Sequence, residues 1–143
     1  MAIPGMVHAL ERAGQLLVPH GVLVCLQPRQ LIRPFIALTA PGHRLSVGRL
    51  VNPKFEHYYS AAEAAIRHVL ADGRFVLIGR TNHQFRVHVA NPSELSRYLE
   101  GARPPHFPPG GRRRLRELWK SRPEGARIEV TESFQAFGLR DSH

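Results

Sequence analysis

The densest group of residues suited to binding chemistry is an arginine run at the expected start of a helix. It comprises Arg112, Arg113, Arg114 and Arg116. Arginine carries a planar fork of N–H donors that matches the oxygens of phosphate and carboxylate groups. Because the helix dipole disfavours cations at an N-terminus, an anion bound there would relieve the repulsion. The run predicts an anion-binding site, and a solvated polar helix face is the alternative.

The net charge of the chain is consistent with an anionic ligand. Among 143 residues, 20 are Lys or Arg and 11 are Asp or Glu, which gives a formal net charge of +9. Only Lys54 and Lys120 are lysines, which leaves 18 arginines. This excess fits nucleic-acid or phosphate binding, and it fits equally a genome that favours arginine codons. A basic nucleic-acid-binding module that uses the helix expected over 112–121 is therefore one alternative.

Patterns typical of metal sites and hydrolases are missing from the sequence. The nine histidines include no H-x-x-x-H pair, and His83 and His88 would point to opposite faces of a regular strand. There is no G-x-S-x-G nucleophile motif. The single cysteine, Cys25, lies within an apolar run and is expected to be a buried structural thiol. We therefore expect no metal site, and the catalytic residues, if any, are unknown.

A second group of candidate residues follows an apolar run from Val22 to Leu26. This run predicts a strand covered on both faces, preceded by an amphipathic helix over 5–18. Ligands of open α/β sheets collect beyond the carboxyl ends of strands. Gln27 and Arg29 follow this strand directly and are therefore candidate substrate-binding residues.

The remaining elements predict an α/β fold with a mixed, partly antiparallel sheet flanked by helices, as one domain over 1–143. The expected elements are a β-hairpin over 35–51, a helix capped by Ser60 and Glu63, a long strand over 75–89, a short helix capped by Asn91, a Pro/Gly-rich loop over 101–111, a helix over 112–121 and a last strand over 126–139. In the last strand the apolar residues change face, which predicts a bulge near Ala136.

Residues 10–24 (LERAGQLLVPHGVLV) resemble the late segment of class I S-adenosylmethionine-dependent methyltransferases. In that family a helix ending in a pattern like RxLxPGG leads into the fifth strand; here His20 replaces the first glycine of the pair. The end of the chain is similar, with a long strand, a capped helix and the approach RPEGARIEV to a last antiparallel strand. In the family this last strand lies between the fifth and sixth strands. The resemblance implies the C-terminal half of a Rossmann-like methyltransferase domain, with residues 35–51 as an inserted hairpin.

The resemblance also nominates residues near the start of the helix that follows the insertion. In the family this helix helps to form the acceptor pocket, which implies a substrate-binding role for His57, Tyr58 and Tyr59. The alternative is that these residues are the amphipathic start of a helix.

The cofactor-binding half of such a domain has no counterpart in the sequence. The family binds its cofactor with a glycine-rich turn, and this chain has no G-x-G-x-G. The resemblance therefore implies a non-catalytic binding or accessory module, or one subunit of a split methyltransferase. Such a chain would hold no cofactor by itself, and S-adenosylmethionine only where a partner supplies the missing half. A divergent methyltransferase completed by dimerisation is the alternative.

The strand from Val22 to Leu26 predicts a partner. In the complete fold it has a neighbour on each side, so here it would present an uncovered apolar edge. We expect a homodimer or a complex with a methyltransferase-half partner through this edge. The sequence has no run of about 18 apolar residues and no basic leader, so we expect a cytoplasmic protein without a membrane span.

Overall fold

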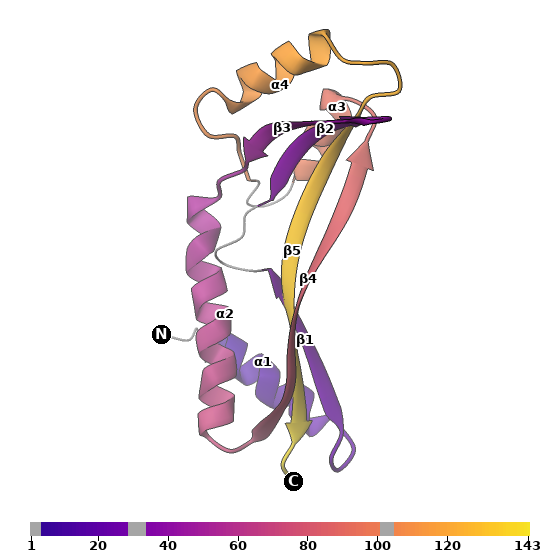
Figure 1. Cartoon of the computed structure of the whole chain (residues 1–143). Helices are drawn as coiled ribbons and strands as arrows, with labels where there is room; N and C mark the ends of the chain where they lie inside the picture. The colour runs from indigo at the N-terminus through magenta and orange to yellow at the C-terminus, as the bar shows by residue number, and fades with distance from the viewer. Residues whose placement is uncertain (1–3, 29–33, 101–104) are drawn as a thin grey trace. The chain divides into compact units, whose positions relative to one another are not determined.

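The computed structural model describes residues 4–28, 34–100 and 105–143, with the backbone alone for 53–56 (Figure 1). Arg29 therefore lies outside the described residues. Within them the chain order is α1 (Pro4–Gln15), β1 (Val22–Pro28), β2 (Phe35–Ala40), β3 (His43–Arg49), α2 (Pro53–Ala71), β4 (Phe75–Val89), α3 (Pro92–Leu99), α4 (Gly111–Lys120) and β5 (Arg127–Asp141). No helix in these parts of the chain is long and apolar enough to cross a membrane.

The strands form one open antiparallel sheet in which β5 pairs with three others. It pairs with β1 through residues 134–140, with β2 through residues 127–131, and also with β4. The hairpin expected over 35–51 is confirmed, because β2 and β3 pair antiparallel around a turn at Gly42, where φ is +74°. The predicted α/β class, with helices beside the sheet, is thus confirmed. The predicted mixed sheet is not observed, because the pairs β1–β5, β2–β3 and β2–β5 are all antiparallel.

The chain divides into two compact units that share the two long strands. Unit 1 contains residues 1–30, 55–83 and 134–143, and unit 2 contains residues 31–54 and 84–133. Each of β4 and β5 therefore contributes part of its length to each unit.

In unit 1, α1 and α2 pack on one face of the strands. Their apolar residues contact Phe75, Phe137 and Leu139, together with the half-buried Leu23 and Cys25 of β1. Side chains of a strand alternate between faces, so the remaining apolar residues of β1 point away from the helices. The prediction that this strand is covered on both faces is wrong, because both helices of unit 1 pack on the same side.

In unit 2, α3 and α4 cover a second core. Leu95 of α3 and Leu115 of α4 pack with Ile36, Ile128 and Val130 from the strands. The half-buried Trp119 of α4 and Phe107, which precedes that helix, also pack against this core.

Two details of the local predictions are wrong for tertiary reasons. Ser60 does not cap a helix, because α2 begins at Pro53 and Ser60 lies inside it. The bulge near Ala136 is absent, since β5 pairs with β1 without a register shift from Phe134 to Arg140. The apolar residues of β5 change face because Ile128 and Val130 face the core of unit 2, whereas Phe137 and Leu139 face that of unit 1.

Candidate functional site

A concave site lies between α3 and α4 in unit 2. This α3–α4 groove has a volume of about 670 Å³, within the range of roughly 300–1,000 Å³ that is typical of small-molecule sites. Most of its surface is apolar, and basic groups stand on its α4 side. It is lined by Pro92, Leu95, Ser96, Leu99, Glu100, Pro105, His106, Phe107, Arg112, Leu115 and Arg116.

The α3 wall of the groove is held in place at both ends of its helix. At the N-terminus, the Asn91 side chain accepts a hydrogen bond of 2.9 Å from the backbone N–H of Glu94, so the predicted cap is confirmed. Near the C-terminus, the Tyr98 hydroxyl donates a 2.6 Å hydrogen bond to Glu132 of β5. Burial and the Glu132 carboxylate together raise the pKa of Tyr98 above its ordinary value.

On α4, two of the four arginines of the run face the groove and two do not. Arg112 and Arg116, one helical turn apart, line the groove, and the Arg112 guanidinium stacks on the Phe107 ring at 5.7 Å. Arg113 points elsewhere and forms a 2.9 Å ion pair with the exposed Glu117. Arg114 donates from Nε to the backbone oxygen of Ser46 on β3 at 3.0 Å. The run thus supplies two arginines to the groove and one to the attachment of α4 to the sheet.

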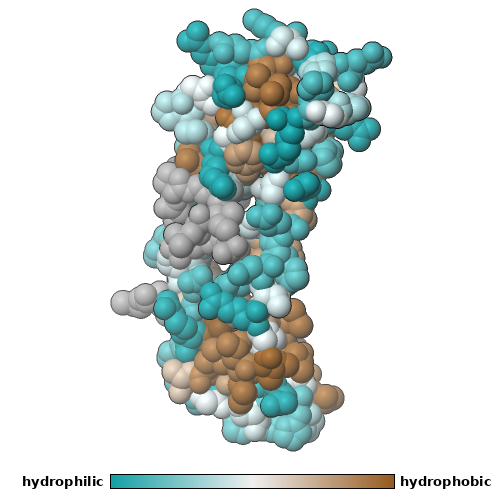
Figure 2. Space-filling view, viewed as in Figure 1, coloured by the Kyte–Doolittle hydropathy of each residue, from teal (hydrophilic) through white to brown (hydrophobic). Residues whose placement is uncertain are grey.

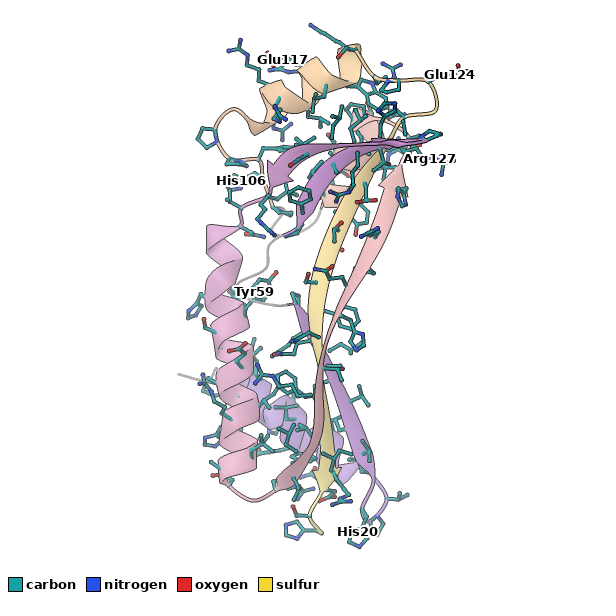
Figure 3. All side chains as sticks on the ribbon, viewed as in Figure 1. His20, Tyr59, His106, Glu117, Glu124 and Arg127 are labelled. Carbon is teal, nitrogen blue, oxygen red and sulfur yellow. The ribbon has the colours of Figure 1, made fainter. Side chains whose placement is uncertain are left out.

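The electrostatics of α4 leave the groove positive. Its first turn contains no acidic residue, and its N-cap, Gly110, adopts φ +82° and has no side chain to satisfy the amides. Among the described residues, neither Arg112 nor Arg116 has a carboxylate within ion-pair distance. Glu100 is the acidic residue of the lining, and it stands just after α3. Figure 3 shows Glu117 on the outer side of α4 and His106 on the segment before it.

The charge of the chain is unevenly divided between the two units. Unit 2 holds 14 of the 20 Lys and Arg residues but six of the 11 Asp and Glu residues, so its net charge is +8. Unit 1 holds the other six basic and five acidic residues, which gives a net charge of +1. A codon bias acts on the whole chain and would spread arginine over two units of similar length. The segregation therefore favours a functional origin for the basic charge.

A buried ionic cluster in unit 2 was not foreseen from the sequence. Glu129 of β5 is 4% exposed, and its Oε1 accepts from Arg44 Nη2 at 3.0 Å and from Thr131 Oγ1 at 3.4 Å. His88 Nε2 of β4 lies 3.3 Å from Oε2. The sequence places Glu129 between Ile128 and Val130, a pattern that indicates an outward-facing polar residue, so it carried no signal of burial.

This cluster ties three strands together. Burial acts to raise the pKa of Glu129, but hydrogen bonds from Arg44 and His88, with the charges of Arg44 and Arg86, outweigh it and lower the pKa. Beside His88 and Arg127 lies a shallow depression of about 270 Å³. Because the Glu129 oxygens already accept these bonds, the cluster is better suited to holding β3, β4 and β5 in register than to proton transfer.

Of the substrate-binding residues predicted in unit 1, Gln27 lines a pocket that the other described ones do not line. That pocket has a volume of about 310 Å³ and is almost entirely apolar, with residues from α1, α2 and β1 around it. Burial raises the pKa of its Cys25 thiol, as expected of a structural cysteine. His57, Tyr58 and Tyr59 lie on α2 and are not among its lining residues (Figure 3).

Unit 1 instead presents an open apolar face. Val22, Val24 and Leu26 of β1 are 46%, 62% and 66% exposed. Beside them on β5 is Gly138, paired with Val24, and a Cβ added there would lie 3.1 Å from Ile78 of β4. Figure 2 shows hydrophobic residues gathered on unit 1, in the region where Figure 1 places α1 and β1. Within the described residues β1 pairs with β5 alone, so its outer edge is open as well.

Neither metals nor known proteins suggest a function. Over residues 4–28, 34–100 and 105–143, no group of three His, Cys, Asp or Glu side chains is arranged to hold a metal ion. Comparisons with protein-family models, curated proteins and solved structures found no match to this chain.

Proposed function

We propose that the chain is the second half of a methyltransferase-like domain, acting as a binding or accessory module or as one subunit of a split methyltransferase. The observation that carries this proposal is the strand order β1–β5–β4. The last strand in the sequence lies between the first strand and the strand after α2, and it runs antiparallel to β1. This is the order that the sequence resemblance implies, with the last strand inserted between two earlier ones.

The open face and edge of β1 support a partner. An edge strand with unpaired backbone groups and three exposed aliphatic side chains is a template for pairing with another strand. Unit 1 carries a net charge of only +1, so two copies would meet there with little repulsion. A homodimer through β1 and a complex with a methyltransferase-half partner are the two forms of the proposal.

A calorimetric titration with S-adenosylhomocysteine, on protein whose mass is known from light scattering, tests this function. We expect no binding heat from the isolated chain and a mass above that of the monomer. One ligand bound per two chains would instead favour a methyltransferase completed by dimerisation. A stable monomer at micromolar concentration that binds no ligand would contradict the homodimer and leave only the complex with a separate partner.

A charge placed on the open face tests the role of β1. Val24→Lys adds a charge to the most central exposed residue of this face and is expected to lower the mass to that of a monomer. Ser93→Lys adds the same charge to an exposed position on α3 and is the matched control. Equal masses for the two variants would refute a β1 interface.

The charge segregation favours a second candidate function, in which unit 2 binds nucleic acid through α4. Replacement of Arg112, Arg113 and Arg114 by Gln is expected to weaken salt-dependent binding to nucleic acid. Each lost phosphate contact lowers the slope of log K against log salt by about 0.7 to 0.9. No binding at low salt by the unchanged protein would contradict this function.

A further inference from the structure

The α3–α4 groove has features that the attraction of phosphates alone does not require. Phosphate attraction alone requires exposed cations, and α4 has these on its outer side. The groove adds an apolar cavity with Phe107 in its lining, flanked by Arg112 and Arg116. An apolar cavity next to cations that have no carboxylate partner among the described residues fits a ligand with an apolar, planar part attached to an anion.

We propose that this groove receives a base of a single-stranded nucleic acid, while Arg112 and Arg116 hold the phosphates next to it. The inference rests on the second candidate function and adds to it the site and the form of the nucleic acid. Apolar walls from Leu95, Leu99 and Phe107 exclude water from the faces of a base. Ser96 and Glu100 lie in the same lining and offer hydrogen-bonding groups to its edge.

The groove selects a single strand because its apolar part lies inside a cavity. In a duplex the faces of the bases are stacked on one another, and their removal from the stack costs a few kcal/mol. A single strand offers unstacked bases, and stacking or apolar contact with each base contributes about 1–3 kcal/mol. The spacing of Arg112 and Arg116, about 5–6 Å between Cβ atoms on one helix face, places both cations along one wall of the groove.

The net charge of unit 2 favours a polymeric anion over a small apolar anion as the ligand. One carboxylate or phosphate needs only the two groove arginines, whereas the net charge of unit 2 is +8. Lys120 is exposed on the same helix outside the groove, where it attracts further phosphates, whereas the exposed Arg113 is paired with Glu117. A nucleic acid uses both the groove and this wider field.

Fluorescence anisotropy with labelled oligonucleotides of about ten nucleotides tests the proposal on the full chain. The probes are a single strand and a duplex of the same length, each titrated at several salt concentrations between about 50 and 200 mM. We expect the single strand to bind at least fivefold more tightly than the duplex, which corresponds to about 1 kcal/mol from one base. Equal affinities for the two probes would overturn the assignment of the groove.

Two double variants with the same loss of charge locate the site. Arg112→Gln with Arg116→Gln removes the groove cations and is expected to lower the salt slope for the single strand by about 1.4, or about 0.7 per contact. Arg113→Gln with Lys120→Gln removes two cations of the same helix outside the groove and is expected to change the slope by less than half as much. Equal effects of the two variants would show a diffuse electrostatic surface and would overturn the site.

Phe107→Leu tests the apolar part of the groove without a change of charge. Leu keeps most of the packing against the core of unit 2, and the loss of the ring is expected to weaken single-strand binding about fivefold or more. Its melting curve, compared with that of the unchanged protein, shows whether the variant is folded. Duplex binding serves as the internal reference, since it should stay constant if the ring contacts a base.

The outcomes separate this inference from the function on which it rests. Salt-dependent binding without strand preference would leave nucleic-acid binding in place and refute the groove. Binding of decanoate in the groove, displaced by no oligonucleotide, would identify a small apolar anion as the ligand and refute the proposal. Absence of all oligonucleotide binding at low salt would refute both, and the β1 interface of unit 1 would be unaffected.

Discussion

Replacement of Glu129 by Gln is the sharpest test of how unit 2 is held together. The substitution keeps the size of the side chain but removes the charge and replaces one of its two acceptor oxygens by an NH2 donor. It leaves the Arg44 guanidinium, now 3.0 Å from Oε1, without its carboxylate partner. The side chain of Glu129 is 5% exposed, and it joins β5 to Arg44 on β3 and His88 on β4.

The expected loss of stability is about 2 kcal/mol. Breaking a fully buried ion pair costs about 3–5 kcal/mol, whereas hydrogen bonds to charged groups contribute about 1.5–3 kcal/mol. The Arg44 and His88 side chains are 48% and 41% exposed, so water screens both partners and the lower range applies. At an m-value of about 2 kcal/mol/M, the urea midpoint should fall by about 1 M.

The pH dependence gives the effect a definite sign. The pKa of Glu129 lies below its ordinary value in the folded state, so the unfolded chain binds its proton more readily. The stabilisation is therefore complete above the ordinary pKa, 4.5, and is lost as pH falls through the folded value. The difference between the unchanged protein and Glu129→Gln should be constant near about pH 7 and should shrink in acid.

Urea unfolding followed by the fluorescence of Trp119, the only tryptophan, measures these stability differences, because Trp119 packs against the core of unit 2. Glu124→Gln makes the same chemical change at an exposed residue of unit 2 and is expected to leave the midpoint unchanged. If Glu129→Gln matched this control at neutral pH, or if its deficit persisted unchanged in acid, the ionic cluster would not stabilise the fold as described.

Three further predictions concern single residues. Asn91→Ala removes the oxygen that accepts from the Glu94 amide and should cost about 1 kcal/mol in chemical unfolding. Gly14→Ala places a Cβ 2.7 Å from Phe75 Cζ in the core of unit 1, and overpacking of about 1–3 kcal/mol should lower the melting temperature despite the better helix propensity of Ala; an unchanged melting temperature would contradict this packing. Burial raises the pKa of the Cys25 thiol, so iodoacetamide should alkylate it more slowly at pH near about 8 in the folded protein than in urea; equal rates would mean that the thiol is accessible.

The locally encoded features were predictable from the sequence. The cap at Asn91 follows from a side chain that reaches the amide three residues ahead, and the 35–51 hairpin from two apolar runs around Pro41 and Gly42. Apolar periodicity likewise predicted helices in the regions of α1, α2 and α4, because it depends on residues that are close in sequence. Ser60 shows the limit of a local motif, since its capping-box spacing occurs inside α2.

The placement of the candidate site depended on contacts between distant segments. The arginine run was visible in the sequence, but only the packing of α4 on β3 and beside α3 directs Arg112 and Arg116 into a groove and Arg113 away from it. Phe107 lies in the segment predicted as a Pro/Gly-rich loop, and it lines that groove because it packs against the unit 2 core.

The sequence by itself determined the elements, the total charge and the apolar character of β1. The tertiary structure decided where these properties lie: it buried Glu129 between strands, left one face of β1 open and gathered a net charge of +8 in one unit. The physical reason is the sequence separation of the residues that interact, since helix caps and turns are formed by neighbours in the chain. Burial and the electrostatic field at a site depend on residues that are far apart in sequence, such as Arg44 and Glu129, which only folding brings together.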